Sequence, residues 1–145
     1  MSYKDAYVTD FSALNEGQKT VFLRALAHLA KSDGKFEKIE IEHIVKVADE
    51  NGINADKIIK NIENDTEAAI LKDIKKIQAR RVAMELIKEM FLLAHTDENL
   101  SDEEIVFIGK CGLAMGIEMA KIEQISNWVI DRIVWLEQAK IIFED

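Results

Sequence analysis

The chain contains an internal duplication in which positions 64 residues apart carry matching residue types. Each copy ends a helix-like run with an aspartate and places a glutamate seven residues later, as Asp33 with Glu40 and Asp97 with Glu104. The same offset matches further positions downstream: Ile41/Ile105, Ile44/Ile108, Gly52/Gly116 and Ile53/Ile117. Because like sequences fold alike, the duplication predicts two similar structural units within one chain.

The units are predicted to be helical. The chain has no proline, and proline breaks helix interiors. Apolar residues recur at helical spacing, as in Phe22, Ala25, Leu26, Leu29 and Ala30, and no run alternates with period two for long enough to form a strand. We therefore expect an all-α chain of about seven helices, at about 15–32, 37–51, after Asn54, after Thr66, 77–96, 101–115 and 118–143.

The duplicated segments, at about 20–53 and 84–117, each read as a helical hairpin with one apolar face. Each face needs a partner, so one fused core is expected over the whole chain of 145 residues, preceded by a short arm at 1–10. A hydrophobic fraction of 48% and a charged fraction of 32% are typical of a globular domain.

The formal net charge of −8 argues against nucleic acid and anionic membrane surfaces, and suits cations or basic partners. No apolar stretch approaches 18 residues and no secretory signal is evident, so we expect a soluble, cytoplasmic protein that does not insert into membranes. Cys111 is the single cysteine and lies on an apolar helical face, which predicts a buried, inert thiol.

The repeated acids predict a cation site. Asp33 lies at the turn of the first hairpin and Glu40 lies in the first turn of its returning helix, so both mark one end of that hairpin. Asp97 and Glu104 do the same in the second hairpin. If the hairpins pack about a pseudo-two-fold axis, four carboxylates gather and repel unless a cation intervenes. Oxygen ligands of this kind favour Ca²⁺, Mg²⁺ or Mn²⁺.

Helix-end architecture is the alternative interpretation. The sequence from Ser101 to Glu104 matches the S-x-x-E capping box, and acidic residues are favoured in the first turn of any helix. In the first repeat, Glu37 stands where Ser101 stands in the second and is a poor cap, yet Glu40 is still present. Both interpretations stay open from the residues alone.

The duplicated motif resembles that of the tellurite-resistance TerB family, whose fold is shared by the N-terminal domain of DjlA-type co-chaperones. The motif is A-x-x-D-G-x-φ-x-x-x-E with φ apolar, and here it is AKSDGKF followed by Glu40, and AHTDENL followed by Glu104. The resemblance covers about 15–140. Glu98 stands where the motif expects glycine, which adds a fifth acid to the second turn.

The resemblance implies a compact bundle of about seven helices with an acidic cluster that binds divalent metal at Asp33, Glu40, Asp97 and Glu104. It also implies a stress-linked or metal-sensing role through protein partners of unknown identity. No catalytic activity is firmly attached to the family, so no catalytic residues are predicted.

We therefore expect a non-enzymatic, metal-binding module. A pure protein-interaction domain, with the acids as caps and a docking surface for a basic partner, is the first alternative. A metal-dependent hydrolase is the second, although the sequence contains no recognisable nucleophile motif. Trp128 and Trp135 are predicted to pack at the edge of the last helix's apolar stripe, with a partner-binding role as the alternative.

Overall fold

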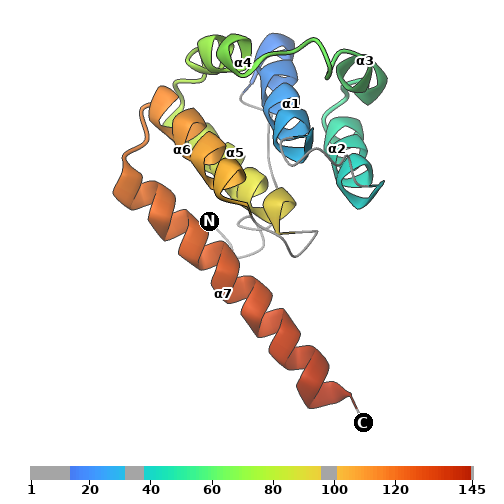
Figure 1. The fold of residues 1–145 in the computed structure, drawn as a ribbon, viewed down its shortest axis with the longest axis vertical. Helices are drawn as coiled ribbons and strands as arrows, with labels where there is room; N and C mark the ends of the chain where they lie inside the picture. Colours follow the sequence, from blue (N-terminus) through green and yellow to red (C-terminus); the bar gives the residue numbers. More distant parts are fainter. Residues whose placement is uncertain (1–13, 32–37, 96–100, 145) are drawn as a thin grey trace.

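The computed structural model describes residues 14–31, 38–95 and 101–144, and within these ranges it contains seven α-helices and no strand. The helices are α1 (Glu16–Lys31), α2 (Lys38–Glu50), α3 (Ala55–Lys60), α4 (Glu67–Ile74), α5 (Arg80–Ala94), α6 (Asp102–Ala114) and α7 (Met119–Phe143). Figure 1 shows their arrangement. The predicted all-α class is confirmed.

The helix boundaries follow the duplication. An offset of 64 residues relates the start of α1 to that of α5, the start of α2 to that of α6, and the start of α3 to that of α7. The equivalent helices α2 and α6 have the same length, 13 residues. In contrast, α3 has 6 residues and α7 has 25, so the halves diverge only after their hairpins.

Glycines end α2 and α6 in the same way. Gly52 has a φ of 71° and Gly116 a φ of 82°, a left-handed conformation that side chains with a Cβ rarely adopt. The next amide in each repeat then bonds back into the last turn, from Ile53 N to Ala48 O and from Ile117 N to Gly112 O, both at 2.9 Å. These bonds satisfy carbonyls at the helix end and aim the chain into the following helix.

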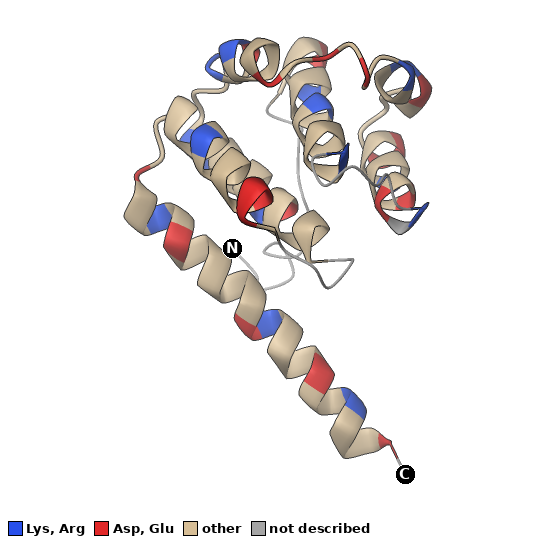
Figure 2. Ribbon diagram, viewed as in Figure 1, with Lys and Arg blue, Asp and Glu red and all other residues tan. Residues whose placement is uncertain are grey.

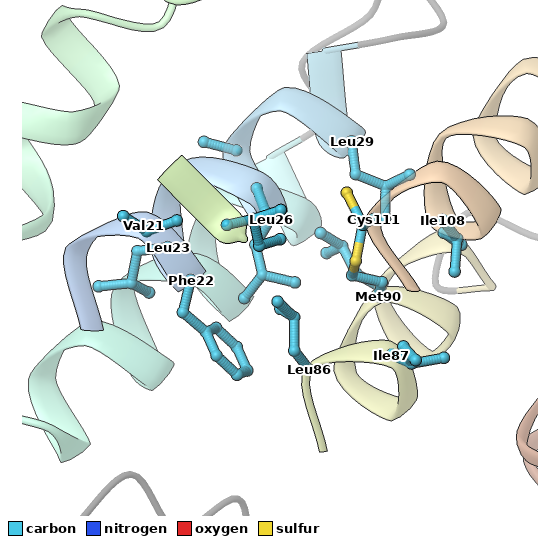
Figure 3. Close-up of a cluster of buried hydrophobic side chains, with 14 of the residues drawn as sticks. Val21, Phe22, Leu23, Leu26, Leu29, Leu86, Ile87, Met90, Ile108 and Cys111 are labelled. Carbon is cyan, nitrogen blue, oxygen red and sulfur yellow. The ribbon is translucent and has the colours of Figure 1, made fainter. Parts of the chain in front are cut away.

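The core lies where α1 meets α5 and α6 (Figure 3). Leu26 and Leu29 of α1 lie beside Met90 of α5 and Cys111 of α6, and all four side chains are buried. Burial raises the pKa of the Cys111 thiol to about 12, which agrees with the predicted inert cysteine.

Two contacts show that the hairpins cross reciprocally. His28 of α1 lies against Phe107 of α6, with ring centroids 4.6 Å apart. His43 of α2, the position equivalent to Phe107, has its Nε2 atom 3.1 Å from Oε2 of Glu89 on α5. Each returning helix therefore contacts the first helix of the other repeat, as a pseudo-two-fold arrangement requires.

The last helix begins on the bundle and then leaves it. Ile122 and Val129 of α7 are buried and the helix packs on α5 and α6, but its C-terminal part projects beyond the other helices (Figure 1). The prediction that both tryptophans pack at the edge of a buried stripe is wrong for Trp135, which is 66% exposed. No opposing helix remains at that point of α7. Trp128, nearer the bundle, is 39% exposed.

A membrane-crossing helix would need to be both long and apolar, and none of the helices in the described ranges meets that requirement.

Candidate functional site

The candidate site is the end of the bundle at which both hairpins turn. The C-terminal ends of α1 and α5 and the starts of α2 and α6 all point to this end (Figure 1). Asp33 and Asp97, the two predicted ligands in the turns themselves, lie outside the described residues. The structure therefore locates two of the four predicted ligands, Glu40 and Glu104.

Glu40 and Glu104 have closely matching environments. Each lies in the first turn of its helix and each is only 1% exposed. Figure 2 shows acidic residues at the starts of both helices. The positive end of the helix dipole stabilises a carboxylate at such a position. Complete burial nevertheless costs a carboxylate several kcal/mol of hydration, about the cost assigned to any buried ion, unless other groups compensate it.

The predicted capping box is present at the start of α6. The Glu104 backbone N–H donates to Ser101 Oγ, and the Ser101 N–H donates to Glu104 Oε1, both at 3.1 Å. The Glu104 carboxylate therefore stabilises the helix end whether or not it also binds a cation. A cap of this kind is worth about 1 kcal/mol.

No three or more His, Cys, Asp or Glu side chains gather into a metal-binding group among residues 14–31, 38–95 and 101–144. A site built on Glu40 and Glu104 therefore needs further ligands, and Asp33 and Asp97 are the acids nearest to it in each repeat's sequence. The resulting donor set contains only carboxylate oxygens, which suits hard divalent cations.

The sequence interpretation missed a group of buried polar side chains on α5. Glu85, Lys88 and Glu89 are all at least nine-tenths buried, and burial lowers the pKa of Lys88. Glu85 accepts a hydrogen bond from Arg81 at 3.0 Å, and Glu89 contacts His43 of α2. A signal existed, since each of these glutamates directly precedes an inward-facing residue of the predicted apolar stripe.

A groove of about 490 Å³ lies between α1 and α3 and runs past Arg24. The guanidinium is clamped by two carboxylates: Nε and Nη2 bond Asp65 at 2.7 and 2.8 Å, and Nη1 bonds Asp73 at 2.8 Å. The hydrogen bond from Arg24 lowers the pKa of Asp73. Because two acids already neutralise this cation, the groove does not offer it to an anionic ligand.

Comparison with family models, curated proteins and solved structures found no match to this chain. The resemblance to the TerB family therefore rests on the duplicated motif in the sequence. What the hairpin ends do has to be inferred from their residues and geometry.

Proposed function

We propose that this chain is a non-enzymatic, TerB-like module that binds a divalent cation at the hairpin end of the bundle, through Asp33, Glu40, Asp97 and Glu104. One observation carries the proposal. Glu40 and Glu104 occupy equivalent positions of the two repeats, and both carboxylates are buried to 1% exposure.

Helix stabilisation alone does not call for this burial. A glutamate interacts favourably with the helix dipole from an exposed position in the first turn. The capping box accounts for Glu104, but the first repeat has Glu37 in place of Ser101, and glutamate is a poor N-cap. A buried carboxylate in both repeats is what a shared ligand role predicts.

The nature of the donors selects the cation. Four carboxylates would carry up to four negative charges, which repel one another and attract a divalent ion. Their oxygens favour Ca²⁺, Mg²⁺ or Mn²⁺ over softer metals. The helix dipoles oppose a cation at this end, so the carboxylate charge has to outweigh them. The TerB resemblance supports a stress-linked, metal-sensing role exerted through protein partners.

A protein-interaction domain without metal is the second candidate, and the capping box favours it. Ser101 and Glu104 satisfy each other's polar groups without any ion. In this case the acids stabilise helix ends and present negative charge to a basic partner.

Thermal unfolding of the chelator-treated protein, with Ca²⁺, Mg²⁺, Mn²⁺ and Zn²⁺ titrated separately, distinguishes the two candidates. A cation at about 100 times its Kd stabilises the folded state by about 2.7 kcal/mol, which raises Tm by roughly 5 to 10 °C for a domain of this size. The double variant Asp33→Asn/Asp97→Asn is expected to lose the shift. The variant Asp49→Asn/Glu50→Gln removes the same charge from exposed positions at the far end of α2 and should retain it.

Glu104→Gln separates capping from metal binding. Glutamine also completes a capping box, so stability without metal should change by less than about 0.5 kcal/mol, whereas the cation shift should disappear. If no ion at millimolar concentration shifts the Tm of the unaltered protein, the acids are helix caps and surface charge, and the interaction domain becomes the working function.

A further inference from the structure

Exposed large apolar side chains are confined to the last two helices of the described chain. On α6 they are Ile105, Val106 and Leu113; on α7 they are Met119, Trp128, Ile130, Val134, Trp135, Leu136, Ile141, Ile142 and Phe143. Helices α1 to α5 expose none within the described ranges. Two neighbouring helices that concentrate the apolar surface of a molecule mark an interaction surface.

The α6 part of this surface is a flat apolar face. Ile105, Val106 and Leu113 lie on the side of α6 opposite its buried residues, and Gly109 lies between them. A Cβ added at Gly109 would meet nothing within 4 Å. The face therefore has room for another helix to approach the α6 backbone closely. We call these four residues the α6 face.

The α7 part is a helical extension that the duplication does not require. Its counterpart α3 ends at Lys60, equivalent to position 124, whereas α7 continues to Phe143. The last buried residue of α7 is Val129. Beyond it, residues 130–143, the α7 overhang, project from the bundle (Figure 1), and Trp135, Ile141 and Phe143 are 66%, 74% and 83% exposed.

The overhang is apolar around most of its circumference. From Ile133 to Phe143 only Glu137, Gln138 and Lys140 are polar. A helix that is apolar nearly all round is normally buried. In the described part of the chain, nothing buries these residues.

We infer that a second copy of this chain covers this surface, in a two-fold dimer in which each α7 overhang lies across the partner's α6 face. The two elements match in length: α6 has 13 residues and spans about 20 Å, and the overhang has 14 residues and spans about 21 Å. A two-fold dimer makes this contact twice, so one symmetric association covers both apolar surfaces of both copies.

The area available fits such a dimer. A fully buried aromatic side chain contributes about 150–250 Å², so the exposed parts of Trp135 and Phe143 alone supply roughly 300 Å² per copy. The aliphatic side chains of the overhang and of the α6 face add to this. A standard specific interface needs about 800 Å² per partner.

The charges favour a second copy over a membrane. The overhang balances Asp131 and Glu137 with Arg132 and Lys140, in a chain whose net charge is −8. An anionic lipid surface attracts segments with an excess of basic residues, and the overhang has none. A neutral overhang can lie against an identical chain without strong repulsion.

The mass of the full chain in solution tests the proposal. Sedimentation equilibrium from about 1 to 200 μM spans the affinities expected of a specific dimer. The expected mass is twice the 16.5 kDa of one chain. Trp135→Lys, on the overhang, and Leu113→Lys, on the α6 face, should each weaken dimerisation at least 100-fold. Asn64→Lys, which adds the same side chain at an exposed position between α3 and α4, should leave the dimer intact.

Mixing the two monomeric variants tests the reciprocal arrangement. In a mixed dimer, the unaltered overhang of Leu113→Lys meets the unaltered α6 face of Trp135→Lys. One of the two contacts is then restored, so an equimolar mixture should contain more dimer than either variant alone. Circular dichroism and thermal unfolding verify that both variants remain folded, because both positions are exposed.

Several results would overturn the inference. A monomeric unaltered chain at every concentration excludes the dimer; cosedimentation of that monomer with phosphatidylcholine/phosphatidylglycerol vesicles would then identify lipid as the occupant. A dimer unaffected by Leu113→Lys would show that the overhang does not lie on the α6 face. Failure of the mixture to recover dimer would exclude the reciprocal contact.

Discussion

Two glycines of α6 predict opposite effects of the same substitution. A Cβ at Gly112 would lie 2.5 Å from Cδ1 and 3.0 Å from Cγ1 of Ile122 on α7, closer than packed carbon atoms come. A Cβ at Gly109, one turn earlier, would meet nothing within 4 Å. The pair therefore measures how closely α7 is held against α6, the packing from which the α7 overhang extends.

The magnitudes follow from two contributions. Alanine is favoured over glycine inside a helix by about 1 kcal/mol, and this gain applies at both positions. Overpacking a closely fitted core costs about 1–3 kcal/mol, and this cost applies only at Gly112. Cδ1 of Ile122 can rotate away because it is the far end of the side chain, but Cγ1 moves only with α7. Gly109→Ala should thus stabilise the fold by about 1 kcal/mol, and Gly112→Ala should destabilise it by up to about 2 kcal/mol.

Urea and thermal unfolding provide the measurement, with both substitutions made in the Trp135→Lys background so that self-association does not contribute to stability. The two variants should differ by about 1–3 kcal/mol, or by several degrees in Tm for a domain of this size. If Gly112→Ala is as stabilising as Gly109→Ala, α7 does not pack this closely on α6, and the reasoning that starts the overhang at residue 130 fails with it.

Three further outcomes are expected. Ser101→Ala should lower the free energy of unfolding by about 1 kcal/mol while Ser101→Thr largely retains it; equal loss in both would show that the capping box contributes nothing. The folded-state pKa of Asp73 is lowered by Arg24, so its contribution is present above the ordinary aspartate pKa of about 4 and is lost as pH falls through the lowered value. Asp73→Asn should therefore show a shallower loss of stability below about pH 4 than the unaltered chain, and parallel acid titrations would contradict this. Since the pKa of Cys111 is about 12, iodoacetamide at pH 8 should modify it only in urea; rapid labelling of the folded chain would disprove its burial.

Local signals explain why the helix boundaries were predictable. Asn54 caps α3 by accepting a hydrogen bond from the Asp56 N–H at 3.0 Å, and Gly52 and Gly116 end α2 and α6 with positive φ. These residues act on their own backbone, so their effect can be read from neighbouring sequence. The duplication then identified equivalent helices without any knowledge of packing.

Features that depend on a distant partner were not predictable in this way. The apolar pattern of α7 continues unchanged from Val129 through Trp135, yet the first is buried and the second exposed, because the pattern does not say where the neighbouring helices end. Similarly, the sequence predicted where Glu40 and Glu104 begin their helices but not that both are buried. Glu89 was missed because its contact with His43 joins helices far apart in the sequence.

The duplication separates the two proposed properties. What both halves share is the hairpin end with its buried glutamate, so a function located there should draw equally on Glu40 and Glu104. What only the second half has is the long α7, so association belongs to that half. The two meet on α6, which begins next to Ser101 and carries Leu113 on its outer face nearly three turns later. A cation that held the start of α6 in place would favour the dimer only if the helix differed between the two states, and the dimer would then strengthen cation binding by the same factor. Because α6 already has its own cap and a core-facing side packed against α5, we expect that factor to be close to one, with the repeated acids and the α7 overhang acting independently.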